Sequence, residues 1–371
     1  MPQALGQYLY ASSRDLKKIL PTKYDVVTLE DPIFEMFPID SVMADKVVWD
    51  QRDSTTGLLA ASTAGGPYQV VPRKGTTRFE ARPGYYRSKL IMDEEMLTKG
   101  ANIGTWGDKI DIQSLQMEDQ DQLLTRAIQR IKQINWTFLT TGAYTNSDQN
   151  GNVVISDQAA LSPFTTSVAW SSVSTATPLF DLRQLKLRHL GQSVTFGRGA
   201  KLYLNSVDVN SLLSNANPND LGAKLKLWLG GSSPGSQPFT LADVNSYLMA
   251  SDLIEIVEWD DNYLADPVGT AAPVATRYIA TGFGVAVGKR LRGEPIGRFV
   301  MTMNPELMMM GMANGAPNAH EVSGIDNLYM NFMWEHEPLQ GITSIGFNGA
   351  PAIEYPGAVV PFRPSGGGSD A

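Results

Sequence analysis

The chain contains no cysteine among its 371 residues. This absence excludes disulfide bonds, thiolate metal sites and a cysteine nucleophile, so stability must come from packing and from association. Histidine is scarce as well, with three residues at positions 189, 320 and 336. Glu335-His336-Glu337 is the only dense cluster of histidine and carboxylates. Because adjacent residues of a strand point to opposite faces, this cluster does not chelate a metal as a unit.

Positive charge is in short supply, with 30 Lys and Arg against 38 Asp and Glu and a formal net charge of -8. A protein that holds nucleic acid tightly is basic, so this balance disfavours tight DNA binding. No apolar run approaches the length of a membrane span, and the first residues lack the pattern of a signal peptide. We therefore expect a protein that is made and used in the cytoplasm, without a membrane.

Catalytic motifs are missing too. The glycine-rich stretch that begins at Gly282 fails as a phosphate loop, because Phe283 stands where glycine is needed and Arg290 stands where Ser or Thr is needed. Its glycines at 282, 284 and 288 do not fit the dinucleotide fingerprint either. No serine carries the elbow pattern of a hydrolase. The sequence predicts a strand ending in a turn here, with no cofactor, no metal site and no catalytic residues.

What the chain does contain is ordinary globular composition, 43% hydrophobic and 18% charged, which argues against wholesale disorder. The clearest element is a long helix over Ile112 to Leu139, with Gly142 placed as its C-terminal cap. At 1.5 Å per residue this helix is ~42 Å long. Its apolar residues at helical spacing are Leu124, Ala127, Ile128, Ile131, Ile134 and Phe138.

The other elements alternate between helix and strand. Asn150-Gly151 predicts a hairpin turn that leads into a strand. Helices are expected over 179–190, 206–213 and 240–249, and strands over 200–204, 253–259, 278–287, 328–334 and 341–360. Asp260 and Asp261 stand in a sequence typical of turns, so we do not interpret them as a pair of catalytic carboxylates. The fold class that follows is α+β.

Residues 1–46 are expected to form an arm with little core of its own. Pro32 and Pro38 bracket Phe34 and Phe37 in a segment that we interpret as extended. Large apolar residues in such a segment need a surface to cover them, often that of a partner.

Residues 47–91 are expected to form a long β-ribbon whose tip, 54–66, is rich in Thr, Gly and Ala. No helix follows to cover either face, and an isolated ribbon is marginal in water. The ribbon is therefore expected to lie on a neighbouring subunit. The candidate residues for contacts between subunits in the arm and ribbon are Phe34, Phe37, Trp49, Tyr68, Val70, Phe79, Tyr85 and Tyr86.

The order of these parts resembles the tailed-phage major capsid fold, and more closely the lambda-type major capsid protein E family. The stretch Arg82-Pro83-Gly84-Tyr85-Tyr86-Arg87-Ser88-Lys89 is similar to the family's Pro-Gly-Tyr turn and basic position at the ribbon's return. The blocks 200–205, 278–297 and 337–354 also resemble the family.

The resemblance implies four parts: an N-terminal arm, 1–46; an extended β-ribbon loop, 47–91; a peripheral domain with a long spine helix, 92–195 and 330–371; and an axial α+β domain, 196–329. It implies a major head protein that assembles with itself into hexamers and pentamers of an icosahedral shell around double-stranded DNA. Portal and scaffold proteins, a decoration protein and weak, non-specific DNA contact are implied as well. The expected location is the virion capsid, assembled in the cytoplasm of a bacterial host.

Three alternatives remain at this point. An encapsulin-like compartment has the same fold, and a tail-tube subunit is also acidic and free of cysteine but lacks so long a central helix. A soluble enzyme with a site that is invisible in the sequence is the third.

Overall fold

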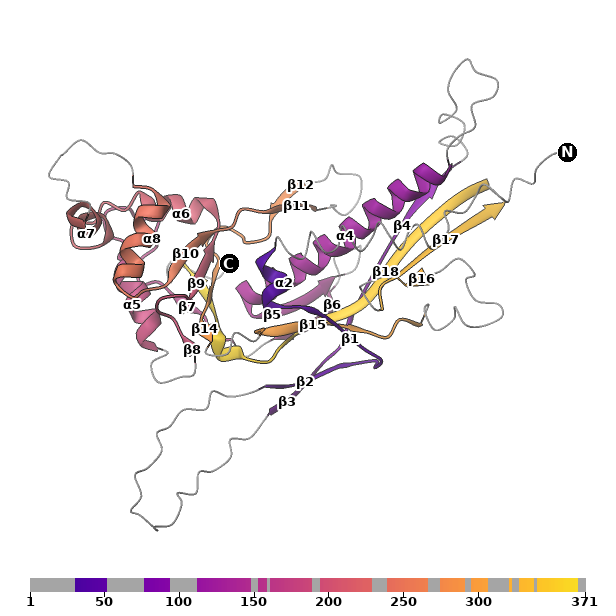
Figure 1. Cartoon of the computed structure of the whole chain (residues 1–371), viewed down its shortest axis with the longest axis horizontal. Coiled ribbons are helices and arrows are strands. Elements are labelled where there is room, and N and C mark those ends of the chain that lie inside the picture. The colour runs from indigo at the N-terminus through magenta and orange to yellow at the C-terminus, as the bar shows by residue number, and fades with distance from the viewer. Residues whose placement is uncertain are drawn as a thin grey trace, which may run out of the picture. The chain divides into compact units, whose positions relative to one another are not determined.

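The structure is a computed structural model, and it describes residues 31–51, 77–93, 112–147, 153–158, 161–188, 194–228, 239–265, 274–290, 295–305, 320–321, 327–336 and 339–365. Contacts divide the chain into two units. Unit 1 comprises Met1–Val48, Glu80–Asn135 and Gly297–Ala352. Unit 2 comprises Trp49–Phe79, Trp136–Ile296 and Ile353–Ala371. Helices and strands alternate in both, so the α+β class is confirmed (Figure 1).

Unit 1 is built on a six-stranded sheet whose long central strand is β18, Leu339–Ile353. One side of β18 carries β17, Tyr329–His336, and then β16, His320–Glu321. The other side carries β4, Gly84–Met92. The strand β15, Gly297–Thr302, also pairs with β18, and β1, Ile39–Val42, adds to β15 in parallel.

The expected long helix is confirmed as α4, Ile112–Thr141. The apolar residues named from its spacing, from Leu124 to Phe138, are all buried. Gly142 ends the helix with a positive φ of 75°, and its N–H donates to the Phe138 carbonyl at 2.9 Å. This conformation favours glycine because it has no Cβ, which is why the helix stops there.

The segment 31–46 does not form an extended arm. Asp31 caps the short helix α2, Pro32–Met36, by accepting from the Ile33 N–H, and its carboxylate pairs with Lys132 at 2.7 Å. The strand β1 follows and hydrogen-bonds to β15. Pro32 stands at the first helical position, where its missing N–H costs nothing, so the proline that we took for a sign of extended chain starts a helix instead.

Part of the expected ribbon belongs to the sheet of unit 1. Two strands, β2 (Val47–Gln51) and β3 (Thr77–Ala81), pair with each other in a separate two-stranded sheet. Residues Tyr85 to Ile91, which we expected in the ribbon, instead pair with β18 over its stretch Ile342–Asn348. Side chains that alternate along this stretch suit a sheet with one covered face. Because the stretch pairs with β18, it is not part of the ribbon. Tyr68 and Val70 lie outside the described residues.

Unit 2 contains a five-stranded sheet in the order β10-β9-β13-β19-β7. These strands are Glu255–Glu258, Lys201–Leu204, Gly284–Val287, Val359–Arg363 and Phe164–Thr165. The helices of this unit are α5 (Pro178–Arg188), α6 (Ser206–Leu213), α7 (Leu221–Trp228) and α8 (Leu241–Ala250). Thr240 and Asp243 form a complete capping box at the start of α8.

Unit 2 also contains smaller β pairs. The hairpin predicted around Asn150 is confirmed as β5 (Ala143–Ser147) paired with β6 (Val153–Gln158). A second hairpin joins β11 (Asn262–Ala265) to β12 (Val274–Arg277), and β8 (Val194–Thr195) pairs with β14 (Lys289–Arg290). Neither α7 nor the β11–β12 hairpin was predicted.

The strand predictions near the C-terminus were too long. Of 278–287, Gly284–Val287 forms a strand, and 341–360 is divided between β18 and β19 by the short 3-10 turn η2, Pro356–Ala358. Because β19 pairs with β13, the last part of the chain joins unit 2. The division at residue 353 therefore differs from the expected grouping of 330–371 with the spine helix.

We predict that Ile131→Ala lowers the free energy of unfolding by about 2–5 kcal/mol, because Ile131 is fully buried in α4 and the change leaves a cavity. Gln122→Ala, on the exposed side of the same helix, is the matched control and should change it by less than about 0.5 kcal/mol. Urea denaturation followed by circular dichroism measures both. Equal losses for the two variants would contradict the burial of this stripe.

Candidate assembly surfaces

Six of the eight residues proposed for contacts between subunits lie in the described part of the chain, and their environments differ. Phe34 and Phe37 are buried in unit 1, with Phe37 at 0% exposure, so the prediction that they are free for a partner is wrong. They were misjudged because α2 and its packing are not visible in a segment that reads as Pro-punctuated and extended. Tyr86 also packs on its own chain, with Phe347 at 5.0 Å on its ring and the Arg130 guanidinium 5.0 Å from its centroid.

Tyr85 differs from Tyr86 because neighbouring strand residues point to opposite faces. It is 58% exposed on β4, and Arg87, Lys89 and Ile91 are exposed at the alternate positions of the same strand. This row forms an exposed face that mixes aromatic, basic and aliphatic side chains. Tyr85 therefore remains a candidate for a contact with another molecule.

The base of the ribbon is formed by β2 and β3. Trp49 stacks on Phe79 with ring centroids 5.9 Å apart, and Asp50 pairs with Arg78 at 3.0 Å. Lys46 and Glu80 form a second ion pair. Val48 is exposed on the other face. The two aromatic rings cover each other in part, Val47 and Ala81 are buried, and most of the remaining side chains of the ribbon base are exposed.

A second exposed surface is the β11–β12 hairpin of unit 2. Leu264 is 66% exposed and Val274 is 59% exposed. Leu264 lies opposite Ala275, and Ala265 lies opposite Val274. Residues directly opposite each other share a face, so the two exposed apolar side chains lie on different faces of the hairpin.

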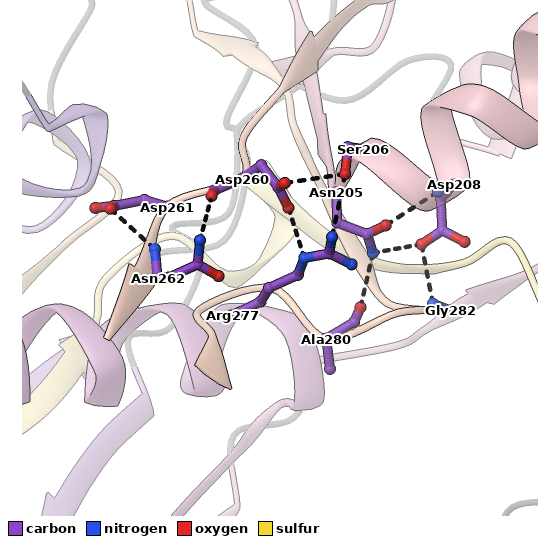
Figure 2. A network of polar contacts seen from close by, with 9 residues as sticks. All are labelled: Asn205, Ser206, Asp208, Asp260, Asp261, Asn262, Arg277, Ala280 and Gly282. Atoms are coloured by element: carbon purple, nitrogen blue, oxygen red, sulfur yellow. Dashed lines mark hydrogen bonds and ion pairs between the residues drawn. The ribbon is translucent and has the colours of Figure 1, made fainter. Parts of the chain in front are cut away.

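A polar network fixes the base of this hairpin to the start of α6 (Figure 2). Arg277 Nε pairs with Asp260 Oδ1 at 2.7 Å, and Ser206 Oγ donates to the other oxygen of Asp260 at 2.9 Å. The Arg277 guanidinium also donates to Ser206 Oγ at 3.3 Å. A single arginine thus joins the second strand of the hairpin to the loop before the first strand and to α6.

The same network continues to the turn before β13 (Figure 2). Asn205 caps α6 by accepting from the Asp208 N–H at 3.0 Å, and its amide nitrogen donates to the Ala280 carbonyl at 3.0 Å. Asp208 accepts from the Gly282 N–H at 2.9 Å. The glycine-rich stretch therefore takes part in a structural turn, and Gly284–Val287 forms the strand that the sequence predicted.

Three buried carboxyl groups stabilise unit 2 through hydrogen bonds. Burial raises the pKa of Asp208, against the opposing effect of the bonds from Gly282 and Asn205. Burial likewise raises the pKa of Asp181, although the Trp170 indole donates to it at 3.0 Å. For Asp220, burial also raises the pKa, and the Leu179 N–H donates to its carboxylate at 3.0 Å.

These carboxyl groups do not form a metal site. Within the described ranges, no three His, Asp or Glu side chains come together closely enough to hold an ion. In the same part of the chain, no helix is long and apolar enough to cross a membrane.

The sequence reasoning missed the β11–β12 hairpin and the exposed end of α7. Each strand of the hairpin has four residues, too few for alternation to stand out. The available signal was Pro267 and Gly269, two turn-forming residues between the short apolar stretches. At α7, the adjacent exposed Leu227 and Trp228 break the helical period and conceal the buried Leu221 and Leu225.

Comparison with known proteins gives one family match. The family model described as phage major capsid protein E matches residues 28–200. No curated protein sequence matches the chain.

Solved structures show the fold. A chain assigned as the capsid protein of a prophage in E. coli CFT073 has a TM-score of 0.55 and 12% identity, covering 95% of this chain and 99% of that chain. A phage-related protein from Bordetella bronchiseptica RB50 has a TM-score of 0.48 and 10% identity, covering 95% of this chain and 97% of that chain. The mature capsid of bacteriophage PhiM1 has a TM-score of 0.39 and 12% identity, covering 89% of this chain and 86% of that chain. The first likeness confirms the expected capsid fold along nearly the whole chain.

We predict that Arg277→Ala loosens the β11–β12 hairpin without unfolding unit 2. Amide hydrogen exchange over 262–265 and 274–277 should become up to about five-fold faster, because a partly exposed ion pair contributes about 1 kcal/mol or less. Arg298→Ala, which removes the Arg298–Asp40 pair of unit 1, is the control and should leave these amides unchanged. Unchanged exchange in Arg277→Ala would show that the network does not hold the hairpin.

We also predict a pH effect for Asp181→Asn. Because the folded-state pKa of Asp181 is raised, its contribution to stability is complete below the ordinary value of 3.8 and is lost as the pH rises through the folded-state pKa. Asparagine still accepts from Trp170 but does not ionise. The unfolding free energy of the variant should therefore fall less than that of the parent as the pH rises from about 4 to 7.

Urea denaturation at several pH values measures this difference. Asp93→Asn, at an exposed position of unit 1, serves as the control and should follow the parent profile. Parallel profiles for Asp181→Asn and the parent would contradict the assigned effect of burial.

Proposed function

We propose that this chain, which matches the family model of phage major capsid protein E over residues 28–200, is the major head protein of a phage. In this role it assembles with itself into an icosahedral shell that encloses double-stranded DNA. The observation that carries the proposal is the family match, which covers the ribbon base, β4 and the whole of α4.

The physical properties of the chain support a shell subunit. A net charge of -8 suits a wall that does not hold its DNA cargo tightly. Without cysteine, the stability of a shell must come from many modest contacts, which add up when a closed lattice forms. The ribbon base and the β11–β12 hairpin supply exposed apolar side chains for such contacts.

The proposal includes the arrangement and the partners of the subunit. We propose hexamers and pentamers as the building blocks, with residues 92–195 and 330–371 as the peripheral part and residues 196–329 as the axial part around their axes. Portal and scaffold proteins, a decoration protein and weak, non-specific contact with DNA complete the set of partners. The site of assembly is the cytoplasm of a bacterial host, and the role is structural, without catalysis or a cofactor.

Negative-stain microscopy of the purified protein tests the proposal. Closed shells of uniform diameter are the expected result. Tubes would indicate a tail protein. Small discrete oligomers would contradict both the shell role and the tail role. Nuclease-resistant double-stranded DNA inside particles from lysed host cells would distinguish a phage head from a compartment that stores proteins.

We predict that deletion of Ser54 to Gly75 gives a folded subunit that forms no shells. The deleted residues lie outside the described part of the chain, and the small, polar members among them contribute little to a core. The strands β2 and β3 that flank the deletion are a two-stranded sheet, which needs a neighbouring surface for burial.

Circular dichroism and sedimentation compare the deletion with the parent. The spectrum should be retained and the fast-sedimenting shells should be lost. Shells of normal size from the deletion would show that the ribbon is not required between subunits, and an unfolded deletion would place the segment in the core.

A further inference from the structure

The strand β10 lies at one edge of the five-stranded sheet of unit 2. The N–H groups of Glu255 and Trp259 donate to carbonyl groups of the β9 segment, at 3.0 and 2.8 Å. Successive residues of a strand present their backbone N–H and C=O groups to opposite sides, so those of Ile256 and Glu258 point away from β9. These groups form the outer edge of the sheet.

Asn245 of α8 occupies this outer edge. Its Oδ1 accepts from the Ile256 N–H at 2.9 Å, and its Nδ2 donates to the Ile256 carbonyl at 2.8 Å. Both backbone groups that Ile256 presents at the edge are thereby paired, as a neighbouring strand would pair them. The helix α8 lies beside β10 (Figure 1) and also buries Val244 and Leu248, so its attachment does not depend on Asn245 alone.

The opposite edge of the same sheet is closed in a related way. Its strand, β7, has two residues. Pro163, directly before β7, has no N–H, and its carbonyl accepts from the Arg188 guanidinium at 3.0 Å. Short edge strands, prolines and charged side chains are the means by which sheets avoid pairing with other chains. Both edges of this sheet therefore carry features that oppose the addition of a strand.

The charges of β10 act in the same direction. The strand begins with Glu255 and ends with Glu258. If two copies of β10 paired antiparallel over all four residues, Glu255 of one copy would lie opposite Glu258 of the other. Like charges directly opposite each other destabilise such a pair.

We propose that Asn245 blocks the outer edge of β10 against pairing with a strand of another copy of the chain. An unpaired edge presents a row of N–H and C=O groups on which another strand can form. In a preparation of the pure protein, another copy is the only source of such a strand. The blocked edge does not depend on the proposed function, because it belongs to the sheet of unit 2 whether or not the chain forms shells.

Asn245→Ala removes both hydrogen bonds at the edge. At low protein concentration the Ile256 amide should exchange about two- to ten-fold faster than in the parent, since one hydrogen bond contributes a modest net free energy. At higher concentration, sedimentation velocity should show polydisperse aggregates that the parent does not form, and exchange of this amide should slow as another copy pairs with it. Faster exchange without aggregates at any concentration would overturn the proposal, and so would an unfolded variant.

Asn205→Ala is the matched control. Asn205 also bonds to one backbone N–H and one carbonyl, those of Asp208 and Ala280, but it lies at the start of α6 and not at a sheet edge. Thermal unfolding should show a loss of stability in this variant, and sedimentation should show no aggregates. Equal aggregation of the two variants would point to general destabilisation and overturn the role of the edge.

Glu258→Pro tests whether the aggregates form by strand pairing. Because the Glu258 N–H points away from β9, proline removes a donor from the outer edge without removing a hydrogen bond of the sheet. Combined with Asn245→Ala, this change should restore the sedimentation profile of the parent. Aggregates that persist in the double variant would show that they form by another route, against the proposal.

Discussion

The pairing of β18 is the constraint on which unit 1 depends. This strand of 15 residues takes hydrogen bonds from β4 and β17 on its two sides, and these segments are far apart in the chain. It contains no charged residue, as burial on both sides requires. Gly346 and Gly349 are needed within it, since the rings of Tyr329 and Phe299 lie where a Cβ would be. A larger residue at either position would displace an aromatic ring of the core.

The helix α4 contributes to two cores in succession. Ile131 is buried in unit 1, and one turn later Trp136 packs against Tyr203 at 5.5 Å and Trp259 at 6.0 Å in unit 2. A helix of 30 residues is longer than most helices of globular proteins. The helix residues from Trp136 onward belong to unit 2, whereas the earlier residues of the helix belong to unit 1.

Local signals explain which parts could be predicted from the sequence. The long helix, α6 and α8 were found because their spacing and caps lie within a few neighbouring residues, such as Thr240 with Asp243. The burial of Phe34 and Phe37 could not be predicted, because it depends on tertiary packing that a local pattern does not show. The sequence also does not distinguish a proline at the start of a helix from a proline in a turn. The β11–β12 hairpin was missed because its stabilising partner, Ser206, stands 71 residues before Arg277.

The energetics of the two exposed ribbons point to neighbours as their source of stability. Each is held at its base by a charged pair, Arg78 with Asp50 and Arg277 with Asp260. Ion pairs at a protein surface are too weak to offset the entropy of ordering a two-stranded sheet. They can set the direction of a ribbon, but they do not stabilise its apolar side chains. Those side chains gain about 25 cal/mol per Å² when another surface covers them. In the shell that we propose, neighbouring copies of the chain would provide that cover at every subunit.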